Sequence, residues 1–121
     1  MKVLIADDHS MMRDGLRAVL EKAGIVVCGE AADGFEVVEL AQALQPEIVV
    51  MDISMPRLNG IDATRQLLAK CTNVRVIALS MYSDRRYVTA MFKAGAAGYL
   101  LKNSASGELI QALHAVADGL T

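Results

Sequence analysis

The sequence predicts an α/β fold of three layers, in which five helices cover both faces of a five-stranded parallel sheet. Short apolar runs of strand length alternate along the 121 residues with segments whose apolar residues recur every three or four positions. No repeat, low-complexity stretch or linker divides the chain, and its length suits one domain. Strict alternation of strand and helix favours right-handed crossovers, and these make the sheet parallel.

The predicted strands are apolar at consecutive positions, as expected for strands that are covered on both faces. They span residues 3–6, 25–28, 48–51, 74–79 and 98–101. Between and after them, apolar stripes at helical spacing run over residues 12–23, 37–44, 61–68, 88–92 and 109–116.

Capping residues mark several helix ends. Asp33 and Glu36 have the spacing of a capping box at the start of the second helix. Ser83 is expected to cap the fourth helix. Gly24 and Gly95 follow the first and fourth stripes and suit left-handed C-terminal caps.

Composition excludes several classes of protein. Hydrophobic residues make up 54% and charged residues 21%, which is a globular composition, and a net charge of -2 gives no footprint for nucleic acid. The apolar runs are too short to span a membrane and no signal peptide is present, so we expect a cytoplasmic domain. Cys28 and Cys71 form no CxxC motif, only His9 and His114 could join them in a metal site, and we expect reduced, buried or half-buried thiols.

Reactive side chains follow four of the five predicted strands. Asp7 and Asp8 follow the first strand, Asp52 the third, Ser80 the fourth and Lys102 the fifth. Ligands of open parallel sheets bind beyond the carboxyl ends of the strands, so these groups are expected to share one edge.

The chemistry of these groups indicates a metal-assisted phosphoryl acceptor. Three converging carboxylates repel one another unless a cation lies among them, and hard oxygen ligands suit Mg²⁺. A lysine and a hydroxyl at the same edge can hold further oxygens of a phosphoryl group, with Asp52 as nucleophile. Each residue alone has an ordinary explanation: Asp8 as a helix N-terminal residue, Ser80 as a turn residue, and Lys102 as a solvated lysine. Their recurrence at strand ends favours the site.

The chain resembles, from end to end, the receiver domain of bacterial two-component response regulators, in their NarL/LuxR-type branch. The matching segments are VLIADDH at residues 3–9, MDISMPRLNG at 51–60, ALS at 78–80 and AGAAGYLLK at 94–102. The resemblance implies a flavodoxin-like fold with strand order 2-1-3-4-5.

The resemblance also implies residue roles at a phosphorylation site. Asp52 would accept a phosphoryl group from a histidine kinase or a small phosphodonor, giving an aspartyl phosphate. The residues that would bind Mg²⁺ are Asp7, Asp8, Asp52 and, through its main-chain carbonyl, Ser54. Lys102 would pair with the phosphoryl group, Ser80 would be the switch hydroxyl, and Tyr99 the aromatic side chain that follows it.

For the whole protein, the resemblance implies a receiver domain over residues 1–121 and a helix-turn-helix DNA-binding domain beyond Thr121. DNA would be contacted only through that second domain, and phosphorylation would control homodimerisation or domain release, and so transcription. Asn103 follows Lys102 where many receivers have proline, which leaves the cis or trans state of this peptide open.

Two other functions fit parts of the pattern. A haloacid-dehalogenase-like phosphatase also uses an aspartate nucleophile with Mg²⁺, but it needs a second acid two residues later, where this chain has Ser54. A phosphorylation-independent interaction module would keep the fold without the chemistry. A dinucleotide-binding domain lacks support, because no GxGxxG follows the first strand. We therefore expect a switch that takes and slowly loses its own phosphoryl group, not a turnover enzyme.

Overall fold

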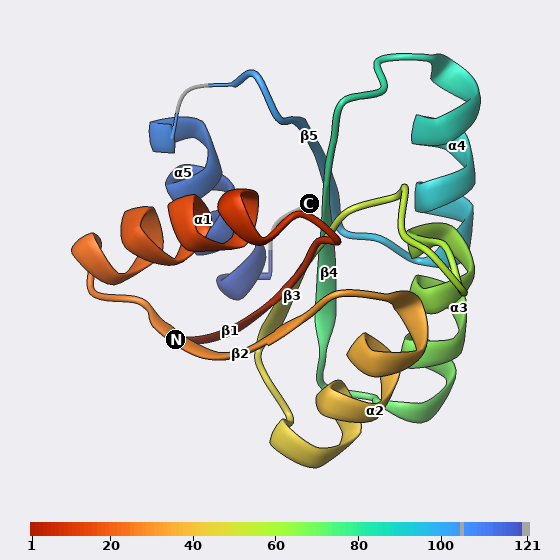
Figure 1. The fold of residues 1–121 in the computed structure, drawn as a ribbon, viewed down its shortest axis with the longest axis horizontal. Coiled ribbons are helices and arrows are strands. Elements are labelled where there is room, and N and C mark those ends of the chain that lie inside the picture. The colour runs from red at the N-terminus through yellow and green to blue at the C-terminus, as the bar shows by residue number, and fades with distance from the viewer. Residues whose placement is uncertain (105, 120–121) are drawn as a thin grey trace.

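The computed structural model describes residues 1–104 and 106–119, and over them the chain forms a three-layer α/β sandwich (Figure 1). The strands are β1 Lys2–Ala6, β2 Val26–Ala31, β3 Ile48–Met51, β4 Arg75–Ser80 and β5 Gly98–Leu101. The helices are α1 Ser10–Lys22, α2 Gly34–Leu44, α3 Gly60–Lys70, α4 Arg85–Ala94 and α5 Ser106–Ala117.

The strands form one parallel sheet in the order β2-β1-β3-β4-β5, which confirms the predicted fold and strand order. Helices α1 and α5 cover one face, and α2, α3 and α4 cover the other (Figure 1). Each face has its own hydrophobic core, because alternate residues of β1, β3 and β4 point to opposite sides. The central strands are fully buried, so they hold the loops at their carboxyl ends in fixed positions.

Most of the predicted element ends are found, with small differences. Asp33 caps α2 by accepting the Glu36 N–H, as predicted, while the Glu36 carboxylate accepts the N–H of Ala32, one residue before the N–H that a capping box uses. The expected cap at Ser83 is wrong: α4 begins after Asp84, whose carboxylate accepts the Arg86 N–H. The predicted second strand also ends too early, because pairing with β1 carries β2 on to Ala31.

Gly60 is required where the loop after β3 enters α3. A Cβ at this position would lie 1.9 Å from the carbonyl oxygen of Asp52, so no larger residue fits without moving the backbone. The Gly60 N–H also donates to the Ile53 carbonyl, which folds the loop back on the end of β3. This close approach fixes the backbone on which Asp52 stands.

The helices of the described residues are too short and too polar for one of them to cross a membrane.

Candidate functional site

The sheet brings the predicted acidic residues to one edge. β1 and β3 are neighbours, and the Asp52 N–H donates to the Ala6 carbonyl at 2.9 Å, so the two loops leave the sheet side by side. Asp7 and Asp52 are only 1% and 4% exposed, although each carries a carboxyl group. Burial of this kind is rare for aspartate unless a partner compensates the charge.

Lys102 supplies that compensation. Its backbone N–H donates to the Ser80 carbonyl at the end of β4. Its side-chain Nζ lies 2.7 Å from Asp7 Oδ2 and 3.2 Å from Asp52 Oδ2. The long lysine side chain therefore reaches from β5 past β4 to bridge both carboxylates. The Lys102–Asn103 peptide is trans, which answers the question left open by the sequence.

The electrostatics of the pair follow from burial and charge. Burial raises the pKa of Asp52, the charge of Asp7 raises it further, and Lys102 opposes both. Partial burial of Lys102 works against its ammonium form, but the contacts with Asp7 and Asp52 outweigh burial and raise its pKa. Lys102 is therefore positively charged at neutral pH, whereas the ionised form of Asp52 is disfavoured by its surroundings.

Asp8 is not the helix cap that its position allowed. The N-cap of α1 is His9, whose side chain makes no capping hydrogen bond, and the first turn of the helix contains no acidic residue. Asp7 Oδ1 instead accepts the His9 N–H at 2.9 Å. Asp7 and Asp8 therefore lie before the N-cap of the helix, at the end of β1 and beside Asp52.

Ser80 and Tyr99 meet at the backbone of Tyr82. Ser80 is fully buried and its Oγ accepts the Tyr82 N–H at 3.0 Å. The Tyr99 hydroxyl donates to the Tyr82 carbonyl at 2.6 Å. The Tyr82 ring stacks on Tyr87 of α4 with centroids 4.5 Å apart, so one residue joins both predicted switch residues to α4.

Ser54 lies in the loop after Asp52, and its N–H points to Asp52 Oδ1 at 3.4 Å. This contact places Ser54 beside the Asp52 carboxylate, as its position in the sequence suggested.

Two arginines that the sequence analysis did not single out support the acidic turn. Arg13 Nη1 donates to the Asp7 carbonyl at 2.6 Å, and its Nε donates to Glu30 at 3.0 Å. Arg17 Nε donates to the other oxygen of Glu30 at 2.7 Å, and this bond is the main cause of the lowered pKa of Glu30. The sequence offered two signals for these contacts: the i,i+4 spacing of the two arginines and the position of Glu30 near the end of β2.

His9 is a third residue at the site whose contacts were not expected. Its Nδ1 lies 3.0 Å from Asp8 Oδ1 and 3.3 Å from Asp7 Oδ1. One ligand atom from each of Asp7, Asp8, His9 and Asp52 lies within 4.8 Å of all the others. The sequence pattern suggested His9 as a metal ligand only beside the cysteines, which in the structure are free and half-buried.

The donor set fits Mg²⁺. Three carboxylates at one edge offer oxygen ligands. Burial and the charge of Asp7 both raise the pKa of Asp52, and a divalent cation beside these carboxylates would stabilise the ionised form.

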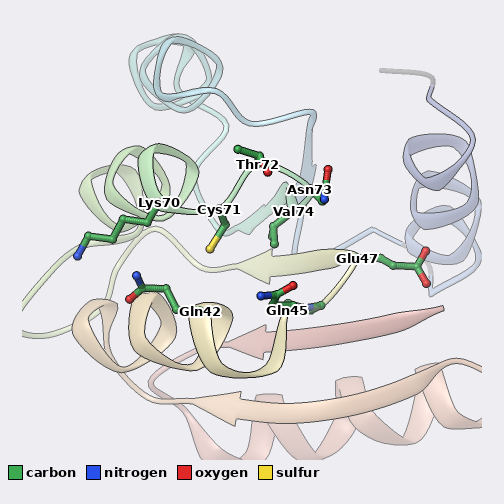
Figure 2. Close-up of a pocket in the computed structure, with 9 residues that line it drawn as sticks. Gln42, Gln45, Glu47, Lys70, Cys71, Thr72, Asn73 and Val74 are labelled. Atoms are coloured by element: carbon green, nitrogen blue, oxygen red, sulfur yellow. The ribbon is translucent and has the colours of Figure 1, made fainter.

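The opposite end of the sheet has a different character. A cavity of about 410 Å³ lies there between the carboxyl ends of α2 and α3 and is lined by Gln42, Gln45, Lys70, Cys71 and Asn73, among others (Figure 2). It contains none of the predicted site residues and no pair of carboxylates. The acidic edge is therefore the candidate site.

Comparison with known proteins agrees with the geometry. The family model of the response regulator receiver domain matches residues 3–114, and the chain belongs to this family.

Among curated proteins, the transcriptional regulatory protein LiaR of Bacillus subtilis is 41% identical over 98% of this chain and 57% of its own length. DegU of Brevibacillus brevis, also a transcriptional regulatory protein, is 39% identical over 98% of the chain and 51% of its own length. The chain thus spans about half the length of these relatives.

Solved structures give the same result. A LuxR-family two-component response regulator from Aurantimonas sp. SI85-9A1 superposes with a TM-score of 0.94 at 36% identity, covering 98% of this chain and 86% of that one. The isolated receiver domain of RcsB from Salmonella enterica serovar Typhimurium, determined with the phosphomimetic BeF3⁻, gives 0.91 at 28% identity, covering 100% and 91%. The chain is a receiver domain of the LuxR/NarL type, the kind found in transcriptional response regulators, which are signalling proteins.

Proposed function

We propose that Asp52 accepts a phosphoryl group and that Ser80, Tyr82 and Tyr99 convert the modification into a change at α4. The observation that carries the proposal is the buried pair Asp7 and Asp52, bridged by Lys102 at the carboxyl edge of the sheet. A purely structural role would not need two buried carboxylates on one lysine, because such a network costs desolvation that apolar residues avoid.

The residues that would hold Mg²⁺ are Asp7, Asp8, Asp52 and the main-chain carbonyl of Ser54. The ion would neutralise the carboxylates and hold phosphoryl oxygens in place. An oxygen of Asp52 forms the new bond to phosphorus as the bond between phosphorus and its donor atom breaks, and the donor leaves with the electron pair. The phosphohistidine of a histidine kinase, or acetyl phosphate, would serve as the donor.

Lys102 is positioned to pair with the transferred group. Its Nζ already lies 3.2 Å from Asp52 Oδ2, so it meets a phosphoryl oxygen after a small shift. The phosphoryl group adds roughly -1.5 to -2 charges and strong acceptor oxygens. These oxygens can accept a hydrogen bond from the Ser80 hydroxyl if its side chain turns toward them, whereas in the unmodified protein Ser80 Oγ accepts the Tyr82 N–H.

The response at α4 follows from the contacts of Tyr82. When Ser80 turns to the phosphoryl group, the Tyr82 N–H loses its acceptor, and the backbone between β4 and α4 becomes free to rearrange. The Tyr99 hydroxyl then loses its partner, and the Tyr82–Tyr87 stack transmits the change to α4. The modification thus biases a two-state equilibrium.

For the full-length protein, we propose that a DNA-binding domain accompanies this domain and that phosphorylation controls its output, by homodimerisation or by domain release. The support is that the curated relatives are about twice as long and are named as transcriptional regulatory proteins.

Labelling by acetyl phosphate tests the acceptor. Wild type should be labelled only with Mg²⁺, Asp52→Asn should not be labelled, and Asp14→Asn, which changes an exposed aspartate of α1, should be labelled as wild type. Labelling of Asp52→Asn would show that another residue is the acceptor.

Two further measurements test the metal and the switch. Asp8→Ala should weaken Mg²⁺ binding at least about tenfold, and unchanged affinity would remove Asp8 from the site. Beryllofluoride with Mg²⁺ should shift the NMR signals of Ser80, Tyr82 and Tyr99. If none of the three moves while beryllofluoride binds, the switch mechanism is wrong.

A further inference from the structure

Arg13 reaches from α1 to the backbone of the acidic turn, the pair Asp7 and Asp8 that follows β1. Its Nη1 donates to the Asp7 carbonyl at 2.6 Å, while the Asp7 N–H donates to the Ala31 carbonyl of β2 at 3.0 Å. Both polar groups of the Asp7 backbone are therefore held. Because the Asp7 carbonyl lies in the plane of the peptide that joins Asp7 to Asp8, Arg13 fixes the peptide from which Asp8 extends.

The guanidinium of Arg13 is itself held by Glu30. Arg13 Nε lies 3.0 Å from Glu30 Oε1, and Arg17 Nε lies 2.7 Å from Glu30 Oε2, so both oxygens of the Glu30 carboxylate are engaged. A guanidinium is planar, and contacts at Nε and Nη1 fix the direction of its plane as well as its position. The ammonium of a lysine, on its flexible stem, does not reproduce two contacts in one fixed plane.

Stability of the fold does not account for this arrangement. Arg13 is the fourth residue of α1, in the first turn, where the helix dipole disfavours a positive charge. The side chains of Arg13 and Glu30 are 18% and 25% exposed, and ion pairs that keep contact with water add only modestly to stability. What the contacts do determine is the direction of the peptide between Asp7 and Asp8.

We propose that Arg13 is a positioning residue for phosphoryl transfer, which sets the direction of the Asp8 carboxylate while Glu30 keeps the guanidinium in place. This inference rests on the proposed function, in which Asp8 binds the Mg²⁺ that transfer to Asp52 requires. Without Arg13, the Asp8 carboxylate has to be ordered when the ion binds, and this ordering lowers the affinity for Mg²⁺. At saturating Mg²⁺ the carboxylate is in place, so the maximal rate of transfer changes little.

The sign of the effect separates positioning from charge. Arg13 is a cation near the proposed metal site, so the loss of its charge by itself would raise the affinity for Mg²⁺. A fall in affinity on Arg13→Ala therefore reports the loss of position. Arg13→Lys keeps the charge and loses the fixed plane, so it should lower the affinity at least as much.

The test compares wild type, Arg13→Ala and Arg13→Lys, with Arg65→Ala as the control. Arg65 is a matched residue, because it is an arginine that pairs with an acidic side chain, Asp62, on the surface of α3. Calorimetry measures the Mg²⁺ affinity, and the initial rate of labelling by acetyl phosphate is measured as a function of Mg²⁺ concentration. Arg13→Ala should lower the Mg²⁺ affinity about tenfold, the smaller of the effects seen when partners of metal ligands are removed, and by no more than Asp8→Ala does. Arg65→Ala should behave as wild type.

Three results would overturn the proposal. The first is a Mg²⁺ affinity of Arg13→Ala equal to or above that of wild type. The second is a lower maximal rate at unchanged Mg²⁺ affinity, which would mean that Arg13 acts on the phosphodonor. The third is wild-type affinity in Arg13→Lys, which would mean that a fixed guanidinium is not needed. In each case labelling of wild type at Asp52 would leave the proposed function standing; if wild type is not labelled, that function fails, and the calorimetric affinities still decide the role of Arg13.

Two double-mutant cycles separate positioning from a general loss of structure. In an Asp8→Ala background, Arg13→Ala should lower the Mg²⁺ affinity no further, because the carboxylate that Arg13 positions is gone. Glu30→Ala should lower the affinity, and its combination with Arg13→Ala should lower it no more than Arg13→Ala alone. Effects that multiply in either cycle would show that the residues act independently, and would overturn the proposal.

Discussion

Replacement of Lys102 by methionine is the most direct test of the electrostatic balance at the site. Methionine is close to lysine in length, so Lys102→Met removes the charge with little change in packing. The variant leaves Asp7 and Asp52, 1% and 4% exposed, without the cation that bridges them at 2.7 and 3.2 Å. Breaking a buried ion pair by removing one partner costs about 3–5 kcal/mol.

We expect about 3 kcal/mol for metal-free Lys102→Met, the lower end of that range, because Asp52 can take up a proton. For a domain of this size the loss corresponds to a fall in Tm of roughly 10 °C. Urea unfolding followed by circular dichroism, at low ionic strength and without Mg²⁺, measures it. Lys93→Met, which changes an exposed lysine in the last turn of α4, should cost less than about 1 kcal/mol.

The pH dependence of Lys102→Met has a defined sign. Loss of the lysine raises the pKa of Asp52 further, since Lys102 is the group that lowers it. The folded variant then binds a proton more readily than the unfolded chain. Its loss in free energy of unfolding relative to wild type is therefore complete above the raised pKa and becomes smaller as the pH falls through that pKa. Mg²⁺ should stabilise the variant more than wild type. A variant as stable as wild type at neutral pH without metal would refute this account of the buried carboxylates.

Three other changes have defined outcomes in thermal or urea unfolding. Asp52→Asn should stabilise the metal-free protein at pH 7 by roughly 1 kcal/mol, because burial and Asp7 raise the pKa of Asp52, and the gain should fade as the pH falls through that pKa. Lower stability of the variant would mean that the Lys102 contact outweighs both effects. Gly60→Ala should lower stability by about 3 kcal/mol or more, since its Cβ meets the Asp52 carbonyl. Gly15→Ala, on the open surface of a helix, should instead raise stability by about 0.5–1 kcal/mol. Similar effects of the two changes would contradict the packing described. Glu30→Gln should lower stability by up to about 1 kcal/mol at neutral pH, because the Arg17 contact lowers the pKa of Glu30. This loss of stability should disappear as the pH falls below 4.5, and a loss that persists in acid would have another cause.

The sequence was sufficient for the fold because its strands are apolar at consecutive positions, even at the sheet edge, where β5 is half-buried. Residues 48–51 and 98–101 are apolar without interruption, and β3 and β5 occupy these ranges in the structure. Ser83 failed as a cap because Asp84, an equally good capping residue, stands next to it, and sequence spacing does not choose between them. The end of β2 depends on pairing with β1, which is a tertiary contact.

For the site, position at strand ends was enough to bring Asp7, Asp52 and Lys102 together, because parallel strands end at one edge. Contacts that depend on side-chain direction were not accessible. Nothing in the spacing of Arg13 shows that its guanidinium reaches the Asp7 carbonyl, and nothing in the sequence aims His9 Nδ1 at Asp8. Such contacts are set by the path of the loop between β1 and α1.

The three contacts of Tyr82 have a consequence for the timing of the switch. Its N–H, its carbonyl and its ring engage Ser80, Tyr99 and Tyr87 respectively, and residues 81–84 between β4 and α4 have no regular secondary structure. The N–H and the carbonyl belong to the two peptide units on either side of the Tyr82 Cα, so a backbone rearrangement at this residue alters all three contacts together. In the proposed mechanism, half-switched states are therefore disfavoured. In that mechanism, the switching rate would be the rate of a short backbone rearrangement, on the nanosecond-to-microsecond scale of loop motion. The phosphoryl group would then set how long the new state lasts, and the loop around Tyr82 would set how quickly it is reached.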